Sequence, residues 1–213
     1  MYCHKYRTPV RSSNVSGTPE NRASTQVVFL DRDGVLNEEC GHITTPEQLV
    51  LIPRSAEAVR LINKQNWLCL VASNQSVLAR GWVTQEQFNG LCKKMNRALE
   101  QSHAHIDDLF YCPHLPSEKG GVVPELSREC PCRKPATGLF DQAARKYGIS
   151  ATQAVFIGDS TSDFEAAARW GMLSIGVRTG FAGKDGKFDR RPDIWAEDLY
   201  DAVQQLLTHW PKK

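Results

Sequence analysis

Residues 28–37 read VFLDRDGVLN, and this stretch decides the fold class. Its first three residues are apolar and typical of a buried strand. Two carboxylates, Asp31 and Asp33, and then Gly34 follow at once. Two like charges this close repel each other unless a cation neutralises them. The stretch therefore predicts a strand that ends at an edge of a sheet where an ion or ligand binds.

From residue 27 onward, strand-like and helix-like segments alternate along the chain. Nearly continuous apolar runs indicate strands that are buried on both faces, and apolar residues at helical spacing indicate helices between them. Thr84 and Gln87 form a capping box, and Gly148 and Gly171 end two of the helices. This alternation predicts an α/β fold with a parallel sheet and helices on both faces. The predicted strands are 26–30, 67–72, 108–112, 154–157 and 173–177, and the predicted helices are 54–65, 84–99, 140–147, 162–170 and 197–208.

Length and composition predict one domain with a short extension. With 213 residues, 41% of them hydrophobic, the chain can fill one globular core, which we assign to residues 27–213. Residues 1–26 carry a formal charge of +3, which predicts a disordered basic extension rather than a secretory signal. The rest of the chain carries −1, so we expect no nucleic-acid surface on the domain and keep RNA binding by the extension as an alternative.

The same features bear on location and partners. No apolar run approaches the roughly 20 residues that cross a membrane, and no secretory leader is recognisable. We therefore expect a cytoplasmic protein with reduced cysteines and no membrane partner. Because helices are expected on both sheet faces and no spare apolar stripe is evident, we expect a monomer.

Polar residues gather where the predicted strands end. Asp31 and Asp33 follow the first strand, residues 73–76 (SNQS) follow the second, and Asp159 with Asp163 follows the fourth. The carboxyl ends of parallel strands meet at one edge of a sheet, where ligands bind. Carboxylates without His or Cys suit a hard cation such as Mg²⁺. A single Asp at a strand end is as often a helix cap, but three strand ends together favour a metal site.

This arrangement predicts a phosphoryl-transfer site. Asp31 can attack phosphorus when Mg²⁺ cancels the repulsion between the carboxylate and a phosphate dianion. Asp33 lies on the same side of the strand and can serve as acid and base, a role that needs a pKa above the usual value of about 4. Gly34 lets the backbone turn sharply. The donors suited to phosphoryl oxygens are Ser73, Asn74 and Lys134.

Four motifs in this order identify a family. DRDGVLN, SNQ, the lysine of CRKP, and GDSTSD resemble the motifs of the haloacid dehalogenase (HAD) superfamily of phosphohydrolases with an aspartate nucleophile. SNQSVLARG, YCPH and CPCRKPATGLF further resemble the D-glycero-D-manno-heptose 1,7-bisphosphate phosphatases and the related histidinol-phosphate phosphatases. The resemblance spans residues 27–208. It implies a three-layer, Rossmann-like parallel sheet without a large cap domain.

The resemblance also assigns roles to individual residues. It implies that Asp31 is the nucleophile, that Asp33 is the general acid and base, and that both bind Mg²⁺ together with Asp159. Asp163 either binds the ion through water or only caps its helix. Ser73, Asn74 and Lys134 are implied to hold the transferring phosphoryl group with the help of Arg133, and the residues implied to contact the rest of the substrate are Glu39, Cys40, Gly41, His42, Gln75, Ser76, Arg80 and Arg133.

Two positions depart from the pattern of the heptose phosphatases. Those proteins commonly carry Lys where this chain has Ser160, and Gly where it has Val77. Both positions lie on the substrate side of the site. The departures therefore leave the reaction class intact, while the sugar and its anomer stay open.

Three of the seven cysteines and one histidine gather in an irregular segment. The motifs CPH (112–114) and CPC (130–132) offer three thiolates and one imidazole, which suit a tetrahedral structural Zn²⁺. The ion would close the loop 112–132 and fix the basic pair that follows it at the crevice. Reduced thiols without metal, a catalytic zinc and a nucleic-acid zinc ribbon fit this segment less well. The predicted zinc ligands are Cys112, His114, Cys130 and Cys132.

The first functional hypothesis is a Mg²⁺-dependent phosphatase that removes the C7 phosphate of D-glycero-D-manno-heptose 1,7-bisphosphate through an aspartyl-phosphate, in the synthesis of a heptose-containing precursor of lipopolysaccharide. A histidinol-phosphate phosphatase is the alternative of the same class. A non-catalytic zinc-stabilised scaffold is the alternative of another class, and it would be expected to lose Asp31 or Asp159, which this chain keeps. A phosphate-transferring mutase usually needs a large cap against water, for which no insertion is long enough.

Overall fold

The computed structural model describes residues 26–210 and the short strand β1 (Lys5–Tyr6). The predicted disordered extension, residues 1–26, therefore lies almost wholly outside the described residues. Strand β1 pairs antiparallel with β4 (Asp108–Cys112) at one edge of the sheet.

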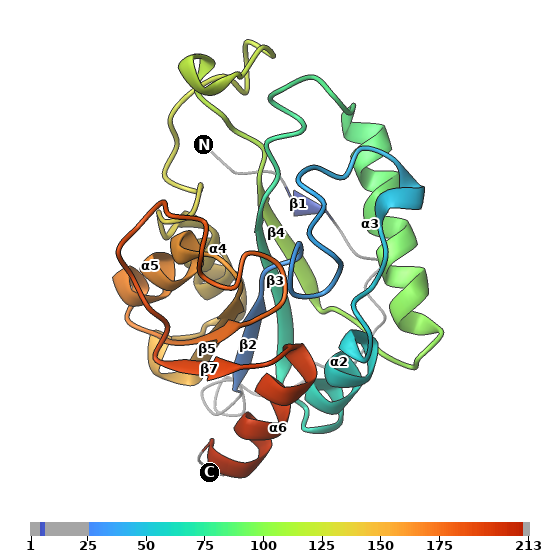
Figure 1. The fold of residues 1–213 in the computed structure, drawn as a ribbon, viewed down its shortest axis with the longest axis vertical. Coiled ribbons are helices and arrows are strands. Elements are labelled where there is room, and N and C mark those ends of the chain that lie inside the picture. The colour runs from blue at the N-terminus through green and yellow to red at the C-terminus, as the bar shows by residue number, and fades with distance from the viewer. Residues whose placement is uncertain (1–4, 7–25, 211–213) are drawn as a thin grey trace.

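Six strands form the rest of the sheet within the described residues, and they are parallel, as predicted (Figure 1). They lie side by side in the order β4, β3, β2, β5, β6, β7. Counted along the chain, this is the doubly wound order 3-2-1-4-5-6, in which the strand order reverses between the first and fourth parallel strands. The remaining bounds are β2 (Val27–Leu30), β3 (Leu68–Asn74), β5 (Ala154–Gly158), β6 (Leu173–Val177) and β7 (Ile194–Ala196).

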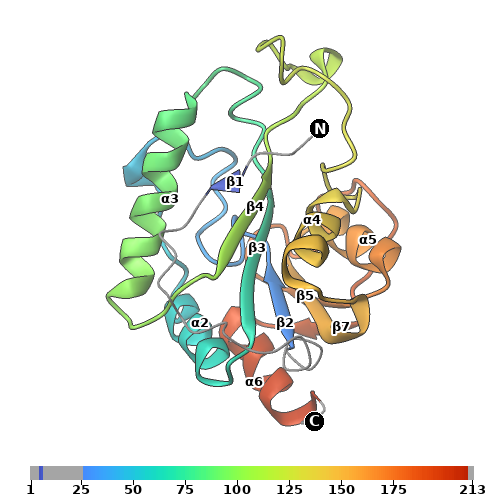
Figure 2. The ribbon, with the colours of Figure 1, turned by 180° about the vertical axis from the view of Figure 1, so that it is seen from behind.

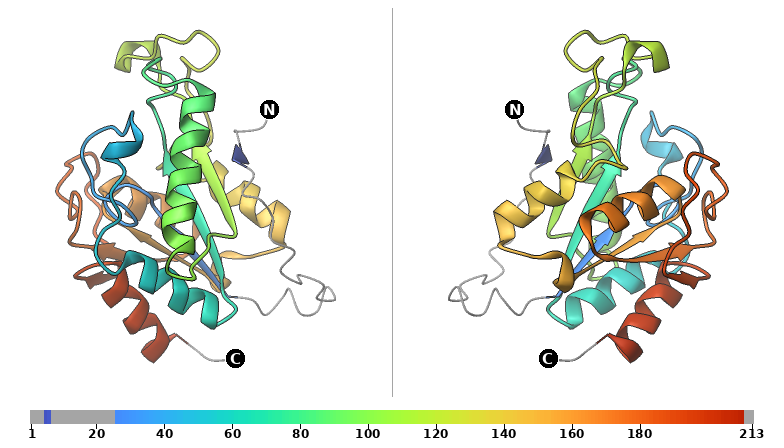
Figure 3. Two further views of the ribbon diagram at one scale, coloured as in Figure 1. Left: turned by 90° about the vertical axis from the view of Figure 1, so that its right-hand side faces the viewer. Right: turned by 90° about the vertical axis from the view of Figure 1, so that its left-hand side faces the viewer.

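Helices cover both faces of the sheet, which confirms the three-layer architecture (Figures 1 and 3). Successive residues of β2 point to opposite faces. Val28 and Leu30 belong to the core under α2, α3 and α6, whereas Val27 and Phe29 belong to the core under α4 and α5. The helices are α2 (Ser55–Lys64), α3 (Gln85–Glu100), α4 (Gly138–Tyr147), α5 (Thr161–Trp170) and α6 (Leu199–His209), with the short 3-10 turns η1 (Pro46–Gln48), η2 (Ser117–Lys119) and η3 (Ala151–Gln153).

Two strands differ from the prediction. β3 continues through Ser73 and Asn74, because these residues pair with Tyr111 and Cys112 of β4. Strand β7 was not predicted, since three residues are too few to show a strand period and Ile194 is partly exposed. The first difference matters for function, because it places two predicted site residues on a rigid strand instead of in a loop.

The segment 113–131 projects beyond the carboxyl end of β4 at the top of the molecule (Figures 1 and 2). Its only helical turn is η2. Within the described residues, each connection between parallel strands holds at most one α-helix, which agrees with the predicted absence of a large cap domain. None of the helices among residues 26–210 is long and apolar enough to cross a membrane.

Candidate active site and metal sites

The predicted site residues meet at the carboxyl ends of three neighbouring strands. Asp31 follows β2 and Asp159 follows β5, on either side of the point where the strand order reverses. The Asp31 N–H donates to the carbonyl of Ile157 at 3.0 Å, so β2 and β5 stay paired up to the site. Ser73, at the end of β3, lies on the other side of β2. This is the crevice in which doubly wound sheets bind ligands.

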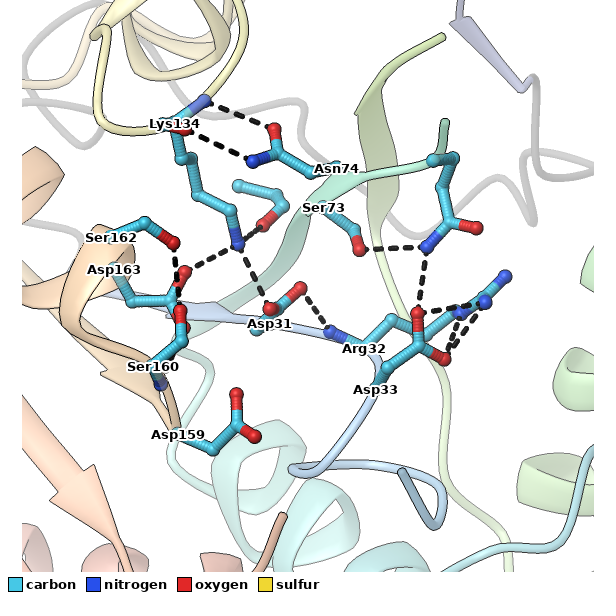
Figure 4. A network of polar contacts seen from close by, with 12 residues as sticks. Asp31, Arg32, Asp33, Ser73, Asn74, Lys134, Asp159, Ser160, Ser162 and Asp163 are labelled. Carbon is cyan, nitrogen blue, oxygen red and sulfur yellow. Dashed lines mark hydrogen bonds and ion pairs between the residues drawn. The ribbon is translucent and has the colours of Figure 1, made fainter. Parts of the chain in front are cut away.

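Lys134 lies between two carboxylates of the site (Figure 4). Its ammonium is 3.0 Å from Asp31 Oδ2 and 2.7 Å from Asp163 Oδ1, and it donates to the carbonyl of Ala72 at 2.8 Å. The side chain is only 1% exposed. Burial lowers the pKa of Lys134, but the charges of Asp163 and Asp31 outweigh burial and raise it. Lys134 therefore stays cationic beside Asp31.

Asn74 orients the backbone of this lysine. The Asn74 amide donates to the Lys134 carbonyl at 3.1 Å, and its Oδ1 accepts from the Lys134 N–H at 3.0 Å. Asn74 thus joins the end of β3 to the segment that follows the cysteine cluster. We expected Asn74 to contact the phosphoryl group directly, and in the structure its side-chain amide is bound to the backbone of Lys134.

Three buried carboxylates lie close together, and two of them pair with Lys134. One ligand oxygen from each of Asp31, Asp159 and Asp163 lies within 4.8 Å of the others. Burial raises the pKa of Asp31 to about 6 against the opposing charge of Lys134. Burial and the neighbouring charges of Asp163 and Asp31 raise the pKa of Asp159 to about 9. The raised pKa values indicate that these buried carboxylates have too little positive charge beside them, and a hard metal ion would supply it.

Asp163 combines a helix cap with an ion pair. Its Oδ2 accepts from the Ser160 N–H at 3.1 Å and from the Ser160 hydroxyl at 2.8 Å, which is a capping box at the start of α5. Its Oδ1 faces Lys134. The cap that we considered from the sequence is therefore present, and the same carboxylate also anchors the lysine.

Asp33 turns away from Asp31 toward Arg32 (Figure 4). The buried Arg32 guanidinium donates to both Asp33 oxygens at 2.8–2.9 Å, and the amides of Asn37 and Gln75 donate at 2.9 and 2.8 Å. Burial raises the pKa of Asp33, but the Arg32 charge and these hydrogen bonds outweigh burial and lower it. We expected a raised pKa for an acid and base; the expectation is wrong for this conformation, because it could not anticipate four donors around one carboxylate.

Gly34 is required where the backbone turns after β2. Its φ of +77° lies in the left-handed region that favours glycine. A Cβ at this position would collide with the Asp159 carboxylate and approach Gly180 Cα to 3.1 Å. The Thr179 hydroxyl also donates to the Gly34 carbonyl at 2.6 Å. The absence of a side chain thus lets Asp159 and the segment after β6 close onto the loop after Asp31.

A polar cavity of about 150 Å³ opens above these carboxylates. Most of the predicted substrate residues line it, whereas Cys40 and Arg80 do not. The Arg80 guanidinium instead lies 5.0 Å from the ring centre of Trp82. Ser160 and Val77, the two positions that depart from the family pattern, both line the cavity. The predicted residues that line it are Asp31, Asp33, Glu39, Gly41, His42, Ser73, Asn74, Gln75, Ser76, Arg133, Lys134, Asp159 and Asp163.

Further residues that were not predicted from the sequence also line the cavity. Arg32, Ile43 and Ser162 line it beside predicted neighbours, and Phe181 and Lys187 line it from the β6–β7 connection. One signal was available for the last two: residues 178–193 form a long connection with three glycines, and long loops in compact domains are usually functional.

The four predicted zinc ligands come together as expected. The sulfurs of Cys112 and Cys132 each lie 3.4 Å from that of Cys130, and they lie 3.7 and 3.4 Å from Nδ1 of His114. Ligands 2.3 Å from a tetrahedral ion would lie about 3.8 Å apart, close to these distances. Hydrogen bonds from the thiols of Cys112 and Cys132 lower the pKa of Cys130. The cluster therefore suits a closed, four-coordinate metal site.

The cluster is joined directly to the cavity. Arg133 follows Cys132 in the chain, and its guanidinium donates to the carbonyl of His114 at 3.3 Å. The Gly138 N–H donates to the carbonyl of Pro131 at 2.8 Å, which ties the start of α4 to the same loop. A metal held here would therefore fix the position of Arg133 and Lys134.

Fold and site together define a phosphohydrolase of the HAD-like class, and comparison with known proteins bears this out. A HAD-hydrolase-like family model matches residues 131–202. D-glycero-D-manno-heptose-1,7-bisphosphate 7-phosphatase of Thermosynechococcus vestitus is 39% identical over 187 residues, which cover 85% of this chain and 95% of that protein. The chain belongs to the HAD-like hydrolases and is a phosphatase.

Two further relatives are named for different anomers of the sugar. D-glycero-beta-D-manno-heptose-1,7-bisphosphate 7-phosphatase of Bordetella bronchiseptica is 33% identical over 85% of this chain and 98% of its own. D-glycero-alpha-D-manno-heptose-1,7-bisphosphate 7-phosphatase of Photorhabdus laumondii is 35% identical over 69% of this chain and 79% of that protein. The crystal structure of D,D-heptose 1,7-bisphosphate phosphatase from B. bronchiseptica, complexed with magnesium and phosphate, has a TM-score of 0.77 at 32% identity and covers 86% of this chain and 99% of that one.

Proposed function

We propose that the chain is a Mg²⁺-dependent phosphatase that removes the C7 phosphate of D-glycero-D-manno-heptose 1,7-bisphosphate through an aspartyl-phosphate. The observation that carries the proposal is the group of three close carboxylates at the carboxyl ends of β2 and β5, two of which pair with the buried Lys134. The names of relatives that match 85% of the chain support the choice of substrate. We further propose that the enzyme is cytoplasmic and monomeric.

The donor set fits Mg²⁺. Lys134 pairs with Asp31 and Asp163, and when Asp159 is also ionised the group keeps a formal charge of −2 that a divalent cation would neutralise. All the available ligand atoms are oxygens, which hard cations prefer. We assign Asp31, Asp159 and the main-chain carbonyl of Asp33 to the ion. When bound, Mg²⁺ would reduce the repulsion between the attacking carboxylate and the phosphate.

Asp31 is the nucleophile in this proposal. One of its carboxylate oxygens forms a bond to phosphorus while the bond from phosphorus to the C7 oxygen breaks, and Asp33 gives its proton to that oxygen. Asp33 then takes a proton from water, which attacks the aspartyl-phosphate, releases inorganic phosphate and restores Asp31. Lys134 and Ser73 stabilise the negative charge on the phosphoryl oxygens in both steps.

Asp33 must carry a proton when the leaving group departs. In the structure, Arg32 and the amides around it favour the ionised form. A phosphate dianion in the cavity opposes this effect, because a neighbouring negative charge raises the pKa of a carboxyl group. Asp33 is 22% exposed and lines the cavity, so it is accessible to the substrate. Substrate binding itself therefore supports the acid form of Asp33.

We further assign a structural Zn²⁺ to the cysteine cluster. The ligand set has three sulfurs and one ring nitrogen, and the spacing of these atoms fits a tetrahedral ion. Because four protein ligands leave no open position, the ion would hold the loop without activating water. Its contribution to catalysis would be the placement of Arg133 and Lys134 at the cavity.

The test is phosphate release in the presence of Mg²⁺ from both anomers of heptose 1,7-bisphosphate, fructose 1,6-bisphosphate and histidinol phosphate. We expect one heptose anomer to be preferred, with the 1-phosphate as product. Asp31→Asn should abolish release while zinc content and folding stay unchanged, and the exposed Asp189→Asn serves as the matched control. Turnover by Asp31→Asn at the wild-type rate would overturn the mechanism, and preference for histidinol phosphate would overturn the substrate.

A further inference from the structure

The β6–β7 connection, residues 178–193, forms one wall of the active-site cavity. Phe181 and Lys187 of this connection line the cavity, and both side chains are exposed at its mouth. The other lining residues come from the loop after β2, from the end of β3 and the loop after it, and from the segments that follow the cysteine cluster and β5. None of the roles assigned so far involves the β6–β7 connection.

Hydrogen bonds tie the first half of this connection to the catalytic residues. The Phe181 N–H donates to Asp159 Oδ2 at 2.7 Å, and the Gly183 N–H donates to the Asp159 carbonyl at 2.7 Å. Gly180, with a φ of +60°, packs against Asp159 and against Gly34. The backbone that carries Phe181 is thus held at a defined place beside a predicted metal ligand.

A second set of contacts holds the other half of the connection. Asp185, with a side chain only 2% exposed, accepts from the Thr161 N–H at 2.7 Å at the start of α5. The Phe188 N–H donates to the Thr161 hydroxyl at 3.1 Å. Lys187 lies between these two anchored residues, and its ammonium is 5.4 Å from the ring centre of Phe181. The lysine therefore stands over the aromatic ring at the rim of the cavity.

Lys187 differs from the other cationic residues of the cavity in how freely its ammonium can reach an anion. Among the residues that the structure describes, four cationic side chains line the cavity, but Arg32 is committed to Asp33 and Lys134 to Asp31 and Asp163. The other two cationic residues that line the cavity are Arg133 and Lys187. The Lys187 side chain is 57% exposed, and the contact of its ammonium with Asp185 is long, at 3.5 Å. It can therefore turn toward an anion in the cavity at little cost.

We infer that Lys187 binds the phosphate of the substrate that is not cleaved, and that Phe181 packs against the carbon face of the sugar. The inference rests on the proposed function and extends it, because it assigns specificity for a bisphosphate to the β6–β7 connection. A substrate with an anion at each end would bridge the catalytic carboxylates and this lysine. A substrate with one phosphate would not use Lys187.

The experiment compares two substrates that differ only in the second phosphate. We would measure kcat and KM for heptose 1,7-bisphosphate and for heptose 7-phosphate with the wild-type protein and with Lys187→Met and Lys187→Arg. Lys184→Met is the matched control, because Lys184 is an exposed lysine of the same connection that does not line the cavity.

Loss of a charged hydrogen bond to the distal phosphate should lower kcat/KM of Lys187→Met for the bisphosphate about 10- to 100-fold, mainly through KM. Turnover of the 7-phosphate should change less than about twofold, Lys187→Arg should keep most of the bisphosphate activity, and Lys184→Met should resemble the wild type. An equal loss on both substrates, or no loss on either, would overturn the inference alone. Failure of the wild-type protein to release phosphate from either substrate would overturn the proposed function and the inference together.

Discussion

Replacing Asp159 by Asn should stabilise the protein in the absence of Mg²⁺ while destroying its activity. Burial and the charges of Asp163 and Asp31 raise the pKa of Asp159 from 3.8 to about 9. At ~1.4 kcal/mol per pKa unit, holding this carboxyl group in the folded state at pH 7 costs about 4 kcal/mol relative to an ordinary Asp. Asn removes this cost and can still accept from the Phe181 N–H.

The assay is thermal unfolding, followed by circular dichroism, after gel filtration into Mg²⁺-free buffer without a chelator, so that any zinc is retained. One kcal/mol shifts Tm by about 2–4 °C in a chain of this size. Because Asn is itself a buried polar group, we expect only part of the 4 kcal/mol and a rise of at least about 4 °C for Asp159→Asn. The exposed Asp189→Asn should melt within about 1 °C of the wild type.

The pH dependence of the unfolding free energy tests whether the raised pKa of Asp159 is the cause of this stabilisation. A carboxyl group with a raised pKa binds more protons in the folded than in the unfolded state, so its contribution makes stability fall as pH rises through the window from about 4 to 9. The raised pKa of Asp31, about 6, adds to this fall only at the acidic end. Between pH 7 and 8.5, the Mg²⁺-free wild type should therefore lose stability while Asp159→Asn should not. A lower Tm for Asp159→Asn, or an equal slope in both proteins, would refute the reasoning.

Two other substitutions test the surroundings of the site. Cys132→Ser should remove zinc, measured by plasma mass spectrometry, and lower kcat/KM at least about tenfold because Lys134 loses its support, whereas Cys40→Ser outside the cluster should keep its zinc. Unchanged activity in zinc-free Cys132→Ser would contradict the role of the cluster. Gly34→Ala and Gly148→Ala each place a side chain at positive φ, which costs about 1–2 kcal/mol. Only Gly34→Ala should also lose Mg²⁺-dependent activity, because only its Cβ would strike Asp159, and equal activity in both variants would argue against that contact.

Local signals account for the elements that were predicted well. The capping box at Thr84 and the glycine that ends α4 act within one or two turns of their own helix, so their effect can be recognised without the rest of the fold. Strand β7 has no such signal. Its three residues form a strand because β6 offers a free edge, with Val177 opposite Ala196.

The sequence by itself determined the order of the parallel strands and helices except β7, the carboxylates that meet at the strand ends and the four residues of the cysteine cluster. It could do so because strand and helix periods are local, and because parallel strands end at a common edge of the sheet. Only the tertiary structure decided the partner of each charge: Arg32 pairs with Asp33, and Lys134 lies between Asp31 and Asp163. It also decided that Lys187 lies at the rim of the cavity. Such contacts depend on side-chain direction and join distant residues, such as Thr179 and Gly34, which lie 145 positions apart.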